Sequence, residues 1–270
     1  MLEILHYPFM QRAILAGIIL SGVFAFLGVY VLLRRMAFFA DGIAHGSLSG
    51  IALGIVFSWY PLAAALVVSA CFALIIYYIE KKFTIASDTV IGIIFTSGMA
   101  LGVLLISIQP GYQPELISFL FGNILAVTAS EIWLIAAIAA GVVLFVICFY
   151  KQLILLSLDE ELAHVSGIKT NVLQPLFYLV LAVTVVLGLK ILGAILVSAL
   201  LILPAASAQI SARSFKTFVV FSIIYAEIIT VGGIMLSYAL NWPTGSVIVL
   251  VGALWFMAIA GVHLFVSKKI

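Results

Sequence analysis

A carboxylate and an imidazole lie one helical turn apart within an apolar stretch of this chain. Asp41 and His45 are four residues apart in the run RRMAFFADGIAHGSLSGIALG, so both side chains would share one face of a helix. A charged group in hydrocarbon costs about 3 kcal/mol on insertion scales, so such a pair usually faces a cavity or a ligand. Aspartate oxygen and imidazole nitrogen both bind divalent transition metals. The pair therefore indicates a transition-metal site; the alternative is a buried hydrogen-bonded pair that fixes a helix contact.

Another acidic side chain, Glu227, lies deep in the apolar run VVFSIIYAEIITVGGIML. An ionisable residue inside a membrane span is a candidate for a transport pathway. It is equally compatible with a polar contact between helices. We therefore predict Asp41 and His45 as metal ligands and treat Glu227 as a possible part of the metal path.

The segment that carries the Asp–His pair also carries glycines at every fourth position. Such a ridge of small residues lets a neighbouring helix approach closely, which would hold the adjacent face rigid. Ordinary helix packing explains the ridge equally well. Its members are Gly42, Gly46, Gly50 and Gly54.

The composition is typical of a membrane protein. Hydrophobic residues make up 66% of the chain and charged residues only 8%, whereas soluble domains carry about 25% charged residues. The net charge of +2 argues against a nucleic-acid partner. The sequence contains no GxxxxGK[ST] phosphate loop and no HExxH, GxSxG or CxxC motif, so we expect no catalytic machinery outside the membrane.

Nine stretches are apolar over about the 20 residues that a membrane-spanning helix needs. The sixth and seventh are almost continuous across GLKILG, so eight spans are the alternative. LISFLFGNILAV (116–127) is too short to span and is predicted to form an interfacial or re-entrant helix. The fold class is therefore an all-α, polytopic transmembrane helix bundle in a single domain, 1–270. Its predicted spans are 13–33, 36–57, 62–80, 89–109, 131–150, 172–189, 191–210, 217–240 and 245–267.

The distribution of basic residues predicts the orientation of these spans. With the N-terminus outside and the C-terminus cytoplasmic, ten of the twelve Lys and Arg residues fall in inner loops, and only Arg12 and Lys190 fall outside. Lys and Arg accumulate in cytoplasmic loops, so this orientation is favoured.

One predicted cytoplasmic loop, KQLILLSLDEELAHVSGIKTN, carries a cluster of acidic residues. Asp159, Glu160 and Glu161 would begin a short helix, where acidic side chains suit the helix dipole, and Gly167 would end it. This segment within 151–170 is either a docking element for a soluble partner or a helix that lies on the membrane.

Six blocks of the sequence resemble, in order, the membrane permease of metal-chelate ABC importers, the bacterial class that takes up zinc, manganese or iron. The block with the Asp–His pair resembles the family signature, and the Asp and His associated there with the metal path fall on Asp41 and His45. LDEELAHVSGI is similar to the coupling helix that sits in the ATPase subunit. The blocks are RRMAFFADGIAHGSLSG, DTVIGIIFTSGMALGVLL, FLFGNILAV, LDEELAHVSGI, LGAILVSALLILPAASA and LSYALNWPTGSVIVL.

This resemblance implies a type II ABC importer-like permease of the bacterial cytoplasmic (inner) membrane that works by alternating access. Two copies would form a homodimer within membrane lipid, two cytoplasmic ATPases would bind the coupling helices, and an extracytoplasmic binding protein would deliver the ion. The chain itself would be a transport subunit and not an enzyme, and no permanently bound cofactor is expected. The cargo would be Zn²⁺, since FMQRA and RRM are most similar to the zinc-uptake branch, or else Mn²⁺ or Fe²⁺. A proton-coupled secondary carrier and a vitamin or siderophore permease are the other classes to weigh.

Overall fold

The structure, a computed structural model, describes residues 6–83, 85–108 and 122–267, and these are almost entirely helical, with no strand among them. The chain divides into two compact units that are interleaved in sequence. Unit 1 comprises Met1–Leu32, Phe121–Phe145 and Ile191–Ile270, and unit 2 comprises Leu33–Leu120 and Val146–Lys190. The single transmembrane domain stays a prediction.

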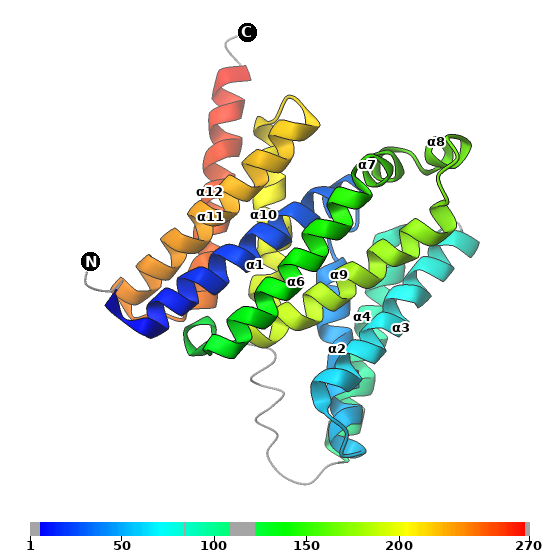
Figure 1. The fold of residues 1–270 in the computed structure, drawn as a ribbon, viewed down its shortest axis with the longest axis horizontal. Helices are drawn as coiled ribbons and strands as arrows, with labels where there is room; N and C mark the ends of the chain where they lie inside the picture. Colours follow the sequence, from blue (N-terminus) through cyan, green and yellow to red (C-terminus); the bar gives the residue numbers. More distant parts are fainter. Residues whose placement is uncertain (1–5, 84, 109–121, 268–270) are drawn as a thin grey trace. The chain divides into compact units, whose positions relative to one another are not determined.

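Nine helices in the described part of the chain are long and apolar enough to cross a membrane, which confirms the predicted all-α polytopic bundle. Each corresponds to one predicted span, with ends that differ by a few residues. They are α1 (Pro8–Leu33), α2 (Phe39–Val56), α3 (Pro61–Lys82), α4 (Ser87–Ser107), α6 (Ala129–Cys148), α9 (Thr170–Leu192), α10 (Ala194–Ser211), α11 (Phe215–Leu240) and α12 (Thr244–Ser267) (Figure 1).

A single residue separates the sixth and seventh spans. α9 ends at Leu192 and α10 begins at Ala194. Between them, Gly193 has a φ of +79°, in the left-handed region that ends helices and that glycine adopts without strain. The number of spans in the described residues is therefore nine and not eight.

The predicted interfacial or re-entrant helix over 116–127 lies partly outside the described residues, which resume at Gly122. From there the structure contains one short 3₁₀ turn, η2 (Ile124–Ala126). The side-chain oxygen of Asn123 accepts a hydrogen bond from the Leu125 amide at 3.2 Å and so begins this turn.

In unit 2, α2 packs along both α3 and α4 (Figure 1). The glycine ridge makes these contacts possible. A Cβ atom at Gly42 would lie 2.7 Å from the Ile91 side chain of α4, and one at Gly50 would lie 2.7 Å from the Ala65 Cα of α3. Both distances are too short for real atoms, so the predicted role of the ridge in close helix packing is confirmed.

In unit 1, α11 and α12 both pack along α10 and along each other. α1 joins them through small and polar residues. Ser222 of α11 donates a hydrogen bond to the Ala25 carbonyl at 2.9 Å, and a Cβ at Gly28 would lie 2.0 Å from the carbonyl oxygen of Leu201 in α10. These contacts depend on close approach of the helix backbones and not on interdigitation of large side chains.

The acid-rich loop between α6 and α9 contains two short helices, α7 (Tyr150–Leu158) and α8 (Glu160–Val165), where the sequence predicted one. Asp159 begins α8, since its carboxylate accepts a hydrogen bond from the Leu162 amide at 2.9 Å. Gly167 ends it with a φ of +82°. The Gly167 and Ile168 amides donate to the carbonyls of His164 and Ala163 at 3.0 and 3.1 Å, which is a Schellman motif. The predicted start and end of this helix are confirmed.

Candidate functional site

Asp41 and His45 are the two partly exposed positions in a buried stretch of α2. Both belong to α2, with Asp41 in its first turn. Every residue from Phe39 to Ala52 is buried except these two, which are partly exposed. The two side chains project from one helix face and retain access to their surroundings, as ligands of a passing ion must.

The imidazole of His45 is held in place by an aromatic contact. Its ring packs edge-on against Phe95 of α4, with centroids 5.0 Å apart and planes at 83°. The Nδ1 atom is buried and has no hydrogen-bond partner. A buried nitrogen without a partner is costly unless a ligand satisfies it, so this atom is a plausible donor to a metal ion.

One chain does not supply a complete metal site among its described residues. No group of three or more His, Cys, Asp or Glu side chains comes together there. Asp41 and His45 belong to unit 2, whereas Glu227 belongs to unit 1. A role for Glu227 in the metal path therefore stays a prediction.

Glu227 has a polar neighbour within its own unit. Its Oε1 accepts a hydrogen bond from Ser21 of α1 at 3.3 Å, while its Oε2 is buried without a hydrogen-bond partner. A Cβ at Gly22 would lie 3.3 Å from Oε1, so the glycine leaves room for the carboxylate. This α1–α11 contact matches the predicted alternative of a polar link between helices.

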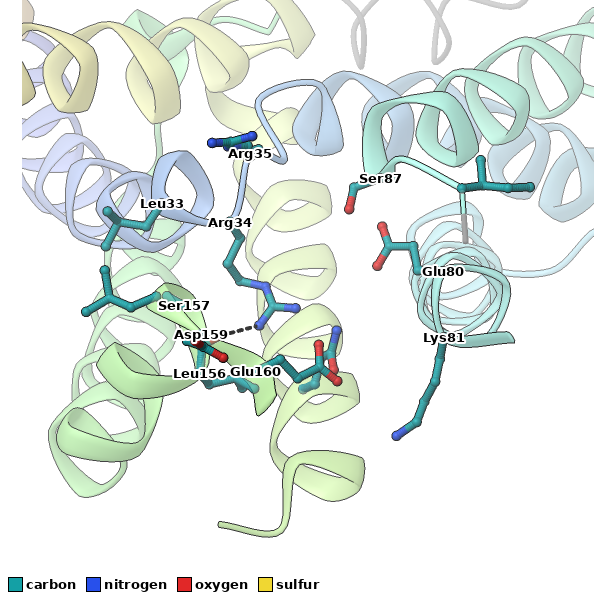
Figure 2. Close-up of a pocket in the computed structure, with 13 residues that line it drawn as sticks. Leu33, Arg34, Arg35, Glu80, Lys81, Ser87, Leu156, Ser157, Asp159 and Glu160 are labelled. Atoms are coloured by element: carbon teal, nitrogen blue, oxygen red, sulfur yellow. Dashed lines mark hydrogen bonds between the residues drawn. The ribbon is translucent and has the colours of Figure 1, made fainter. Parts of the chain in front are cut away.

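A polar site that sequence reasoning missed lies at one end of unit 2. There, a cavity of about 330 Å³ opens between the α1–α2 connection, the C-terminal end of α3, the α7–α8 junction and α9. Figure 2 shows Arg34 extended toward Leu156 and Glu160, with Glu80 on the other side of the cavity. The only sequence signal was that Arg34 and Lys81 belong to loops predicted to be cytoplasmic. Those loops and the acid-rich loop meet at this one cavity, as the predicted alternation of spans requires.

Four side chains that line this cavity, together with Tyr178 behind them, form what we call the Arg34 network: Arg34, Glu80, Glu160, Gln174 and Tyr178. The Arg34 guanidinium donates to the Leu156 carbonyl at 3.3 Å and to the Tyr178 hydroxyl at 3.4 Å. The Tyr178 hydroxyl in turn donates to Glu80 Oε2 at 2.6 Å. Partly buried polar groups that are paired in this way help to hold their helices in one arrangement.

The four residues predicted to couple the chain to an ATPase have different local roles. Asp159 caps α8, Gly167 ends it, and Glu161 is exposed. Glu160 lies beside Gln174 of α9, and its two carboxylate oxygens can accept from the Gln174 amide nitrogen at 3.0 and 3.3 Å.

Apolar side chains on the surface of α8 were not foreseen either. Leu162 is 52% exposed and Val165 is 83% exposed, on a helix that is too short and too polar to span a membrane. Exposed apolar residues of this kind mark surfaces that bind a partner or a membrane.

Comparison with known proteins identifies the family to which this architecture belongs. Residues 6–262 match the ABC 3 transport family. The chain belongs to this family. The match begins before α1 and ends within α12, and it confirms the resemblance given by the sequence blocks.

Relatives within the family include permeases named for different metals. The chain is 35% identical to the manganese import system permease protein ScaB of Streptococcus gordonii over 263 residues, 97% of this chain and 93% of that protein. It is 33% identical to the high-affinity zinc uptake system membrane protein ZnuB of Haemophilus influenzae over 245 residues, 91% of this chain and 94% of that protein. The chain is therefore a permease of the manganese and zinc ABC importer family, and family membership alone does not select the metal.

A solved structure of the same family has the same fold. PsaBC from Streptococcus pneumoniae in complex with Fab matches with a TM-score of 0.83 and 34% sequence identity over 96% of this chain and 93% of that chain. The nine apolar helices and the membership of this permease family identify a multi-pass protein of the bacterial inner membrane.

Proposed function

We propose that this chain forms the membrane path of an ATP-driven importer for divalent transition metals. It would work as a homodimer by alternating access, and separate cytoplasmic subunits would hydrolyse ATP. The observation that carries the proposal is the exposure of Asp41 and His45 within a helix that is buried around them. A carboxylate and an imidazole on one accessible face, in a permease of this family, are suited to a passing metal ion.

The metal site would be shared between two copies of the chain. A two-fold axis along the path would bring together two Asp41–His45 pairs, which supply two oxygen and two nitrogen donors. This proposal is supported by the lack of a third ligand in the described residues of one chain. The partnerless Nδ1 of His45 also supports it.

Zinc is the metal that this donor set favours. Zn²⁺ is usually bound by four ligands in a tetrahedron and accepts imidazole and carboxylate, so two pairs would fill its coordination. Mn²⁺, the second candidate, prefers more oxygen ligands, which water could add. A transport site releases its ion, so neither metal would be bound permanently.

α8 would dock on the ATPase, and an extracytoplasmic binding protein would deliver the ion from the opposite side. The docking role is supported by the exposed Val165 and Leu162, beside the exposed acid Glu161. Val165→Asp should therefore reduce the amount of ATPase that co-purifies with the permease, while Val172→Asp on exposed α9 surface should not. Equal co-purification of both variants with wild-type amounts of ATPase would contradict docking through α8.

The decisive experiment is metal uptake by the purified chain in proteoliposomes, with and without its ATPase. ATP-dependent uptake of Zn²⁺, competed less well by Mn²⁺, is the expected result. Uptake without the ATPase would instead indicate a proton-coupled carrier. In cells, deletion of the gene should impair growth in medium whose metals are chelated, and added zinc should restore growth. Rescue by manganese alone would make manganese, and not zinc, the transported metal.

A further inference from the structure

We propose that the Arg34 network is a relay that carries movement of α8 to the first turn of α2, and so to Asp41 and His45. This inference rests on the proposed function and adds the residues that would link ATPase docking to the metal ligands. Every member of the network belongs to unit 2. Arg34, Tyr178 and Glu80 would act as positioning residues, since none is a proposed metal ligand.

The relay begins on α8, the proposed docking helix. Glu160, the first residue of α8, lies beside the buried amide of Gln174, which is only 4% exposed. The Gln174 amide is assigned so that its nitrogen donates to Glu160 at 3.0 Å. In this orientation the amide oxygen of Gln174 accepts a hydrogen bond from Arg34 Nη2 at 2.6 Å. A displacement of α8 would therefore act on the Arg34 guanidinium through the Gln174 amide.

Arg34 connects three segments through one planar group. It lies in the connection between α1 and α2, and it holds the Leu156 carbonyl of α7 and the Tyr178 hydroxyl of α9. Its guanidinium carbon also lies 5.5 Å from the centroid of the Tyr178 ring. The rigid fork of an arginine suits such simultaneous contacts, which the single ammonium of a lysine could not reproduce.

Tyr178 connects Arg34 to both α2 and α3. Its ring is fully buried and packs edge-on against Phe39, with ring centroids 5.5 Å apart. Phe39 lies two positions before Asp41 in α2. Its hydroxyl donates to Glu80 near the C-terminal end of α3. One side chain thus contacts the helix that carries the metal ligands and the helix that packs along it.

The α1–α2 connection would transmit displacement, not absorb it. It is short, from Arg34 to Phe38, and its Arg35 has a φ of +55°, a conformation that non-glycine residues rarely adopt. Such a conformation persists only where surrounding contacts enforce it. Movement of Arg34 would accordingly turn the beginning of α2 as a whole.

Removal of a single oxygen atom tests the relay. Tyr178→Phe keeps the buried ring and deletes the hydroxyl that joins Arg34 to Glu80, while the matched control Tyr78→Phe deletes an exposed hydroxyl of α3. Each variant is reconstituted with the ATPase, and Zn²⁺ and Mn²⁺ uptake is measured against ATP hydrolysis in the same vesicles. We expect Tyr178→Phe to hydrolyse ATP at close to the wild-type rate and to transport about tenfold less metal per ATP, as for one lost hydrogen bond to a charged group. Tyr78→Phe should match the wild type.

The outcomes separate the relay from a purely structural role. Unchanged metal per ATP in Tyr178→Phe, or equal losses of hydrolysis, uptake and melting temperature, would overturn the relay. A double variant with Glu160→Gln should be no worse than the more impaired single variant, because both interrupt one chain of contacts; multiplied effects would contradict this. A wild-type complex that transports neither ion would remove the proposed function, whereas normal wild-type transport with an unaffected Tyr178→Phe would remove the relay alone.

Discussion

At the scale of single residues, Asp41 and His45 are expected to be indispensable to transport. Asp41→Asn or His45→Ala should lower metal uptake by more than about 100-fold, since even the outer partners of metal ligands contribute 10- to 100-fold. Insertion should be unaffected, because the apolar spans are unchanged. Uptake in cells that express equal amounts of each variant is the measurement. His263→Ala, which alters an exposed histidine near the end of α12, is the control. Wild-type uptake by both pair variants would show that the pair is only structural.

Gly167 should be sensitive to substitution through its backbone alone. A Cβ at this position would meet no neighbouring atom within 4 Å, so Gly167→Ala adds only the strain of a left-handed conformation, about 1 kcal/mol. This cost should loosen the end of α8 and reduce ATPase co-purification. Gly92→Ala is a matched control, since Gly92 is equally unhindered but lies within α4 with an ordinary helical φ. If both variants bind the ATPase equally well, the cap of α8 is not needed for docking.

At the scale of elements, the close packing of α2 on its neighbours predicts a steric limit. A Cβ at Gly50 would lie 2.7 Å from the Ala65 Cα and 2.9 Å from the Ala64 carbonyl oxygen, and neither backbone atom can turn aside. Gly50→Ala should therefore destabilise the protein by about 1–3 kcal/mol, as overpacking does. Its melting temperature in detergent should fall below that of Gly141→Ala, a substitution in α6 with open space around it. A Gly50→Ala variant that melts with the wild type would mean that α3 can move away without cost.

The elements show how far sequence reasoning reaches in a membrane protein. The nine spans were predictable because each must bury its own backbone hydrogen bonds across about 20 apolar residues, a requirement that local composition reveals. α7 was not predicted as a separate helix, and only the nonhelical Phe149 divides it from α6. Asp41 and His45 were recognisable because polar residues are conspicuous in such a run.

The Arg34 network could not have been predicted in the same way. Its contacts join residues as far apart in the sequence as Arg34 and Tyr178, 144 positions. Taken singly, Arg34 is a typical cytoplasmic-loop cation and Tyr178 a typical aromatic residue of a membrane helix. Only the folded arrangement of α3, α8 and α9 gives these residues common partners.

At the scale of the whole molecule, a shared metal site makes the two copies interdependent. A mixed dimer with one wild-type subunit and one His45→Ala subunit should lose most of its uptake, because its single shared site would lack one of the two nitrogen donors. The measurement is uptake by purified heterodimers that carry two different affinity tags, with metal content determined in parallel. One ion per wild-type dimer is expected. About half activity in the mixed dimer, with two ions per wild-type dimer, would instead support one independent site per chain.

The interleaving of the two units in the sequence has a consequence for biosynthesis. Unit 2 is complete once Lys190 has been synthesised, and its α2, α3 and α4 pack with helices close by in the chain. Unit 1 instead joins the first helix to the last ones: the Ser21–Glu227 contact spans 206 positions. On the ribosome, α1 would enter the bilayer long before α10 and α11 exist, with its glycines and its Ser21 still facing lipid. Contacts between such distant segments form slowly. The first helix to be made would thus be among the last to find its partners, and the nascent chain would be most vulnerable to membrane proteases during that interval.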